Sequence, residues 1–223
     1  MIYSDLVAEA DLLVDFRQRF FEAQMKSLEL VFSLWQADIA EKRKLETVCW
    51  NLRRALPRNL FAREQFLLVV PNSRIPASVQ IRGLLPNFDE PDHLEISDRW
   101  RDLARPHDAP YLILDPCARL IDLRWHQRYR QYWVRQMAQY GHVPMTLVEG
   151  ITWLAHRHQL THAETAYHCD YLILGTKGKG GRVIRILQGL GNQVKLSVSP
   201  WRVESDRFTR PQFLLTRKQQ YHH

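Results

Sequence analysis

Apolar residues recur every three or four positions through the first 56 residues, which is the period of an amphipathic helix. One series is Leu6, Ala10, Leu13, Phe16 and Phe20, and the segment contains neither glycine nor proline. A single helix of this length would extend about 80 Å, so we expect a break in the polar stretch 36–44. The helices then either fold back as a hairpin or pair with a second copy of the chain.

Two short apolar segments follow in the middle of the chain, at residues 66–70 and 111–115. A proline follows each of them and marks the end of an extended segment. Apolar runs of this length are typical of strands that are covered on both faces. We therefore predict a buried strand at each position and leave residues 75–85 open between helix and strand.

Two further helices are predicted after the second of these strands. Aromatic residues recur with helical spacing from Arg124 to Tyr140, and Gly141 is typical of the position just after a helix end. Thr146 and Glu149 have the spacing of a capping box, in which each side chain bonds the other residue's backbone N–H. This pair predicts a helix that runs to about residue 158.

The C-terminal part changes to short strand-like segments separated by glycine-rich or polar loops. Consecutive strands joined in this way favour an antiparallel meander. Helices first and strands last predict an α+β fold, with a helical segment at residues 1–56 and an α+β core with a basic C-terminal sheet at residues 57–223. The predicted C-terminal strands are residues 170–174, 182–187, 193–199 and 212–216.

The net charge of +7 is concentrated near the C-terminal end. Residues 170–223 hold ten lysines and arginines against three acidic residues, whereas the counts before residue 170 are equal. A local excess of this kind favours contact with the phosphates of a nucleic acid. We expect that contact at the glycine-rich loop, through Lys177, Lys179, Arg182 and Arg185.

An acidic segment in the middle of the chain suggests that the positive charge of the C-terminal region is neutralised within the molecule. Seven aspartates and glutamates lie between Asp89 and Asp108, together with three arginines. Opposite charges attract within a Debye length of about 8–10 Å. The acidic segment can therefore neutralise the basic C-terminal region of the same molecule.

Cysteine content and hydropathy bear on the compartment. Cys49, Cys117 and Cys169 are far apart and odd in number, which argues against a disulfide framework and favours a reducing cytoplasm. Charged residues interrupt every apolar run before it reaches the about 18 residues of a membrane span, and the start of the chain lacks the pattern of a signal peptide. We expect a cytoplasmic protein with no membrane partner and no cofactor.

A motif in the middle of the chain carries a family resemblance. Pro144-Met145-Thr146-Leu147-Val148-Glu149-Gly150-Ile151, the two apolar strands before it and Cys169 leading into Leu174-Gly175-Thr176 stand in a characteristic order. Over roughly Phe66 to Ile186 the chain resembles a bacterial family of similar-sized proteins with a domain of unknown function. The resemblance implies a bacterial, cytoplasmic protein with a shared α+β core, and it carries over no catalytic residue.

Some residues are of types suited to metal binding or catalysis. His158 and His162 have the i, i+4 spacing of helical metal ligands, and Cys169 is a third candidate. Asp115 closes a predicted buried strand, where α/β enzymes often carry functional groups. On these patterns alone we assign neither a metal nor a catalytic residue, but they define an alternative site around Asp115 and the segment from His156 to Cys169.

Arginines alternate with aromatic residues between Arg124 and Arg135. This combination suits base stacking with phosphate contact, and it also suits a protein interface. The helical spacing fits equally well an amphipathic helix that packs its aromatic residues into the core.

These observations favour a non-enzymatic protein whose basic C-terminal sheet binds a nucleic acid or another partner weakly. The N-terminal helices are candidates for homo-oligomer formation. The alternative is an enzyme, a hydrolase or transferase with possible help from a metal, with its site near Asp115 and the segment 156–169.

Overall fold

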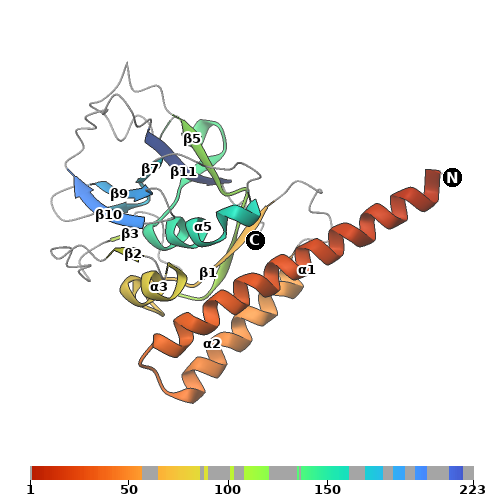
Figure 1. Ribbon diagram of the computed structural model, residues 1–223, viewed down its shortest axis with the longest axis horizontal. Coiled ribbons are helices and arrows are strands. Elements are labelled where there is room, and N and C mark those ends of the chain that lie inside the picture. The colour runs from red at the N-terminus through yellow and green to blue at the C-terminus, as the bar shows by residue number, and fades with distance from the viewer. Residues whose placement is uncertain are drawn as a thin grey trace.

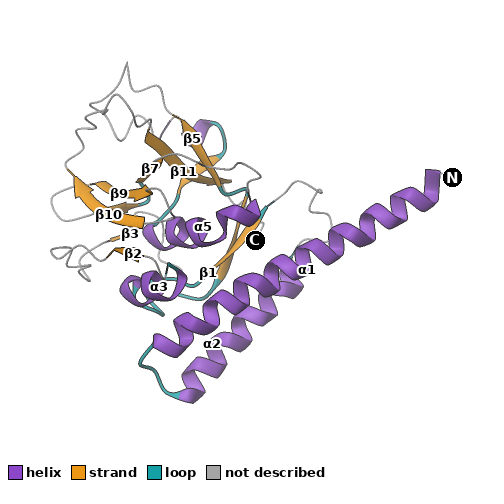
Figure 2. Ribbon diagram, viewed as in Figure 1, coloured by secondary structure: helices purple, strands orange, loops and turns teal. Residues whose placement is uncertain are grey.

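The computed structural model describes residues 2–56, 65–85, 88–89, 101–102, 108–120, 135, 137–160, 169–177, 183–188, 194–199 and 211–217. They form the predicted α+β fold, in which an N-terminal helical hairpin packs beside a mixed core and a mainly antiparallel sheet (Figure 1). Figure 2 shows α1 (Ile2–Leu34), α2 (Ile39–Leu52) and α3 (Ala77–Leu84) on one side, the larger sheet on the other, and α5 (Leu147–Leu160) between them. Within the described ranges, no helix is both long and apolar enough to cross a membrane.

The first two helices, α1 (Ile2–Leu34) and α2 (Ile39–Leu52), form a hairpin, and a short 3-10 helix η1 (Arg53–Ala55) follows. The chain reverses between Leu34 and Ile39, where the polar stretch begins. Asp38 caps α2, because its side chain accepts a hydrogen bond of 2.7 Å from the backbone N–H of Glu41.

Both predicted central strands are confirmed, and they pair with each other. Strand β1 (Phe66–Val69) runs antiparallel to β4 (Tyr111–Leu114), with Phe66 opposite Leu114. The segment left open between helix and strand forms the helix α3 (Ala77–Leu84). The side-chain oxygen of Asn72 accepts a 2.7 Å hydrogen bond from the Ala77 N–H and so fixes the start of α3.

The larger sheet has the strand order β2-β10-β9-β7-β11-β5, and β6 also pairs with β11. Strands β7, β9 and β10 form the predicted antiparallel meander. The last strand departs from it, because β11 returns to the far side of β7 and pairs with it in parallel. The strands are β2 (Phe88–Asp89), β5 (Cys117–Leu120), β6 (His142–Pro144), β7 (Cys169–Ile173), β9 (Val183–Gln188), β10 (Val194–Ser199) and β11 (Pro211–Arg217). A separate small pair joins β3 (Arg101–Asp102) to β8 (Thr176–Lys177).

Helix α5 (Leu147–Leu160) lies between the larger sheet and the N-terminal helices. Its Gly150 is pressed against the sheet, because an added Cβ would overlap the side chain of Ile173 and come within 3.2 Å of Leu214 Cδ1. At the other end of α5, the ring of His156 lies 6.2 Å from that of Phe20 in α1. One hydrophobic core therefore runs from the helical hairpin through α5 to the sheet.

Two buried glutamines satisfy backbone groups around β1. Gln24 of α1 accepts a hydrogen bond of 2.7 Å from the Leu68 N–H through its Oε1. Gln80 of α3 donates through its Nε2 to the carbonyl oxygens of Val70 and Ile75, at 3.0 and 2.7 Å. Around this strand, glutamine side chains thus form hydrogen bonds to the backbone that a neighbouring strand would otherwise form.

Candidate functional site

The structure places two of the four predicted phosphate-binding residues, and both belong to strands. Lys177 lies in β8, where its backbone is in register with Arg101 of β3. Arg185 is half-buried in β9, which lies between β7 and β10. Lys179 and Arg182 lie outside the described residues.

Two short strands of the acidic segment pair with strands of the basic part of the chain. Strand β2 sets Asp89 opposite Lys195 of β10, and β3 sets Asp102 opposite Thr176 of β8. Lys195 itself is exposed to solvent. The backbone pairing thus places the acidic segment beside the basic part of the chain, and its register also sets Arg101 opposite Lys177.

The structure gives the backbone position of two of the three candidate metal ligands. His158 lies in the last turn of α5 and Cys169 begins β7, whereas His162 lies outside the described residues. No group of three or more His, Cys, Asp or Glu side chains that could hold a metal ion occurs among the residues described. The neighbouring His156 is buried against Phe20, and burial lowers its pKa to about 4. It is therefore a neutral core residue near pH 7.

Asp115 directly follows β4, as predicted. The conformation of its backbone explains why an aspartate occupies this position. Its φ of 46° lies in the left-handed region, which aspartate adopts more readily than most residues. Its N–H donates a 2.8 Å hydrogen bond to the carbonyl oxygen of Gln65. Asp115 thus turns the chain from β4 towards β5.

The thiol of Cys49 is equally unsuited to chemistry. The side chain is buried in α2, and burial, reinforced by the nearby charge of Glu46, raises its pKa to about 12. A thiolate is the reactive form of cysteine. Cys49 therefore packs as a small apolar residue.

Only the end of the predicted arginine–aromatic helix falls within the described residues. Arg135 and Tyr140 are exposed, whereas Met137 is buried. Gly141 has a φ of +72° and donates a 3.1 Å hydrogen bond to the carbonyl oxygen of Ala138, which confirms the predicted helix end. The stripe between Arg124 and Trp133 lies outside the description.

A buried polar cluster surrounds Glu149 at the start of α5, and it confirms the capping box. The Thr146 N–H donates to Glu149 Oε2 at 2.6 Å, and the Glu149 N–H donates to Thr146 Oγ1 at 3.4 Å. The hydroxyl of Tyr111 donates to Glu149 Oε1 at 2.8 Å. Thr176 Oγ1 accepts a 2.7 Å hydrogen bond from the Leu147 N–H. Tyr111 and Thr176 escaped the sequence analysis because both are distant along the chain.

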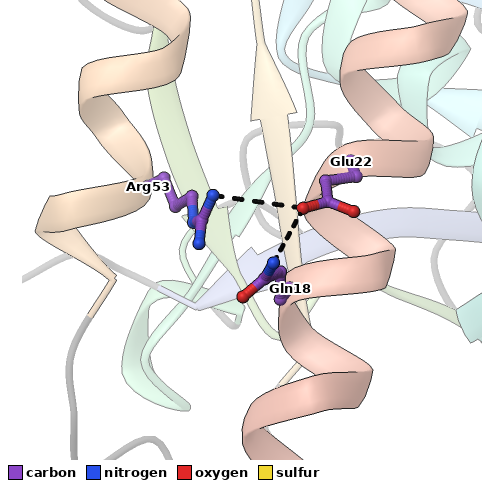
Figure 3. A network of polar contacts seen from close by, with 3 residues as sticks. All are labelled: Gln18, Glu22 and Arg53. Carbon is purple, nitrogen blue, oxygen red and sulfur yellow. Dashed lines mark hydrogen bonds and ion pairs between the residues drawn. The ribbon is translucent and has the colours of Figure 1, made fainter.

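The N-terminal part of α1 is the described feature that stands furthest from the core. Arg53 at the end of α2 lies 4.0 Å from Glu22, which also accepts a 2.9 Å hydrogen bond from Gln18 (Figure 3). These contacts mark the level on α1 at which the hairpin ends. Beyond it, residues 2–17, called here the α1 arm, project away from the other helices and the sheet (Figure 1).

The α1 arm is about 24 Å long, at about 1.5 Å per residue. At its base, Phe16 is 57% exposed, and its ring stacks on that of Phe20 with centroids 6.2 Å apart. Phe16 thus adds an aromatic ring to the exposed surface at the base of the α1 arm.

Comparisons of the chain with protein-family models, with curated proteins and with solved structures found no match.

Proposed function

We propose that the protein acts by binding a macromolecular partner and that the α1 arm makes the contact. The projection of the arm beyond the end of α2 carries this proposal. Most of the stability of a helix in a protein comes from the packing of its apolar face, and an isolated helix of about this length is marginal in water. A partner that covers the arm would add such packing.

The sequence of the arm supports the same proposal. The apolar series that becomes buried at Phe20 continues through Leu13, Ala10 and Leu6 into the arm. Burial of a large apolar side chain is worth about 1.5–3 kcal/mol. Leu6 and Leu13 would each contribute about this much to the binding of a partner that covers them.

Structural roles account for three of the residues that were considered for an enzyme. His156 is a neutral core residue, Asp115 forms a turn, and Glu149 caps a helix with both carboxylate oxygens engaged. These roles favour a binding protein over a hydrolase or transferase.

The proposal is tested by removing residues 2–16. The full chain and the truncated chain are immobilised, and the macromolecules that each retains from an extract are identified by mass spectrometry. A Tyr140→Ser variant is the matched control, because it removes a different exposed aromatic side chain, 74% exposed. A partner lost only with the arm supports the proposal, and identical retention by all three chains contradicts it.

A second candidate function is weak, sequence-independent binding of nucleic acid by the basic C-terminal region. It is favoured by the charge excess of residues 170–223 and by the exposed Lys195 on β10. If three cations contact phosphates, the log–log salt slope of binding should be about −2 to −3.

This second candidate is tested with a mixed-sequence duplex at about 50 mM salt, where non-specific affinity is high. Changing Lys177, Lys179, Arg182 and Arg185 together to glutamine should abolish binding. Absence of binding by the unmodified chain would contradict the candidate and favour neutralisation by the acidic segment.

A further inference from the structure

The side of α2 that faces solvent is basic. Five of its positions have the i, i+3, i+4, i+7 and i+11 spacing of one helix side, and Arg54 follows in η1, about one turn further on. All six side chains are exposed, whereas Leu45 and Cys49 on the opposite side of α2 are buried in the core. The members of this basic face are Ala40, Arg43, Lys44, Thr47, Asn51 and Arg54.

The three cations of the basic face are not paired with acidic side chains. Within the part of the chain that the structure describes, Arg43, Lys44 and Arg54 form no ion pair and no side-chain hydrogen bond. The glutamates of α2 fall outside the spacing of the face, and the charge of Glu46 acts on the buried thiol of Cys49 instead. The face therefore presents three positive charges to solvent, and none of its own side chains is acidic.

This chemistry suits phosphate better than a lipid surface. Arginine and lysine donate charge-assisted hydrogen bonds to phosphate oxygens, and the amide of Asn51 is a further donor. An amphipathic helix that binds a bilayer buries large apolar side chains in it. Ala40 is the one apolar member of the basic face, because the larger apolar residues of α2, such as Leu45, face the core.

The positions of the cations also distinguish between a duplex and a single strand. Arg43 and Arg54 are eleven positions apart, which corresponds to about 16 Å along the helix axis. The major groove of a duplex is about 12 Å wide, so a helix that crosses it can place one arginine near each of the two phosphate backbones. Thr47 and Asn51 lie between the arginines and would face the groove. A single strand has one phosphate backbone and would not meet both ends in this way.

We propose that the basic face of α2 docks a duplex nucleic acid, with Arg43 and Lys44 at one phosphate backbone and Arg54 at the other. The surface is separate from the α1 arm, and it is also separate from the basic region of residues 170–223. In Figure 1, α2 lies at the edge of the molecule beside α1. A duplex can therefore approach the basic face from solvent.

The proposal is tested with the full chain and a fluorescently labelled duplex of mixed sequence, whose anisotropy reports binding at about 50 and 150 mM salt. Arg43→Gln with Arg54→Gln removes one cation from each end of the face and keeps a residue of similar helix propensity. The dissociation constant at about 50 mM salt should rise at least about tenfold. The log–log salt slope should become less negative by about 2, because each lost phosphate contact contributes about 0.9.

The matched control is Lys26→Gln with Arg135→Gln, which makes the same change in net charge at exposed positions outside α2. Its dissociation constant should stay within about twofold of that of the unmodified chain. Thermal unfolding shows that each variant is folded.

Unchanged duplex binding by the Arg43→Gln, Arg54→Gln variant would overturn the proposal. Absence of binding by the unmodified chain at about 50 mM salt would also overturn it, and so would tighter binding of a single strand of the same sequence. A variant that loses binding to phosphatidylserine vesicles but keeps duplex binding would assign the face to lipid. None of these outcomes decides whether the α1 arm binds a partner, which the retention experiment tests separately.

Discussion

Gly83 of α3 lies directly against the backbone of Val31 in α1. A Cβ added at Gly83 would come within 2.8 Å of Val31 Cα and 2.9 Å of its nitrogen. Contacts under 3.0 Å with backbone atoms cannot be relieved by a change of rotamer. This glycine therefore sets how closely the hairpin can approach the rest of the core.

The first prediction is that Gly83→Ala destabilises the fold by about 1–3 kcal/mol, the usual cost of overpacking. The higher helix propensity of alanine, worth about 1 kcal/mol, offsets part of this cost. Urea unfolding measures the difference. Ser78→Ala on the same helix is the control and should change stability by less than about 0.5 kcal/mol.

The second prediction concerns the cap of α5. Glu149→Ala leaves the Tyr111 hydroxyl and the Thr146 N–H without their acceptor in a buried site, so we expect a loss of about 2–4 kcal/mol for the two groups. Thr146→Ala removes the longer, 3.4 Å hydrogen bond and should cost about 0.5–1 kcal/mol. Thermal unfolding of both variants checks the order. An equal loss of stability in the two variants would contradict the prediction that the hydrogen bonds of Glu149 contribute more than that of Thr146.

The third prediction concerns Gln24, whose side chain takes the place of a neighbouring strand. Gln24→Leu keeps the volume but leaves the Leu68 N–H without its acceptor, at a cost of about 1–3 kcal/mol. The matched control is Gln18→Leu on the exposed side of α1, where the hydrogen bond to Glu22 faces solvent. A control as damaging as Gln24→Leu would show that helix packing, and not the hydrogen bond, is responsible.

The fourth prediction is a pH dependence from His156. Its pKa is about 4 in the folded protein and 6.5 in the unfolded chain, so only the unfolded chain takes up its proton between these values. Stability should therefore fall as the pH decreases from about 6.5 to 4, by about 3 kcal/mol from this residue. His156→Leu should remove that part of the slope, measured as the difference between the two chains in urea unfolding at pH 7.0, 5.5 and 4.5. Parallel slopes for the two chains would show that the pKa of His156 is the same in the folded protein as in the unfolded chain.

The elements that were predicted correctly are those with a local signal. The capping box of Thr146 and Glu149, the glycine at 141 and the two central apolar strands each depend on residues within a few positions of one another. Helix α3 was left open because its start is fixed by Asn72, five residues before Ala77, and not by a usual capping residue at its N-cap.

The features that escaped prediction depend on contacts distant in sequence. The pairing of β11 with β7 places Phe213 opposite Leu172. The hydrophobic periodicity of a strand does not indicate which other strand pairs with it. The roles of Gln24 and Thr176 are of the same kind, since each serves a backbone group on another element. The structural roles of Asp115 and His156 are of this kind too, because residue type alone does not show the hydrogen bond to Gln65 or the packing against Phe20.

The place of β11 has a consequence for synthesis of the protein on the ribosome. This strand pairs with β5, β6 and β7, so residues 211–217 join parts of the sheet that precede them by many positions. Until those residues emerge, β7 lacks a neighbour on one side, and β5 and β6 lack their common partner. Open strand edges of this kind invite pairing with other chains. The larger sheet is therefore completed only late in synthesis. Chains released before residue 211 should be prone to aggregation.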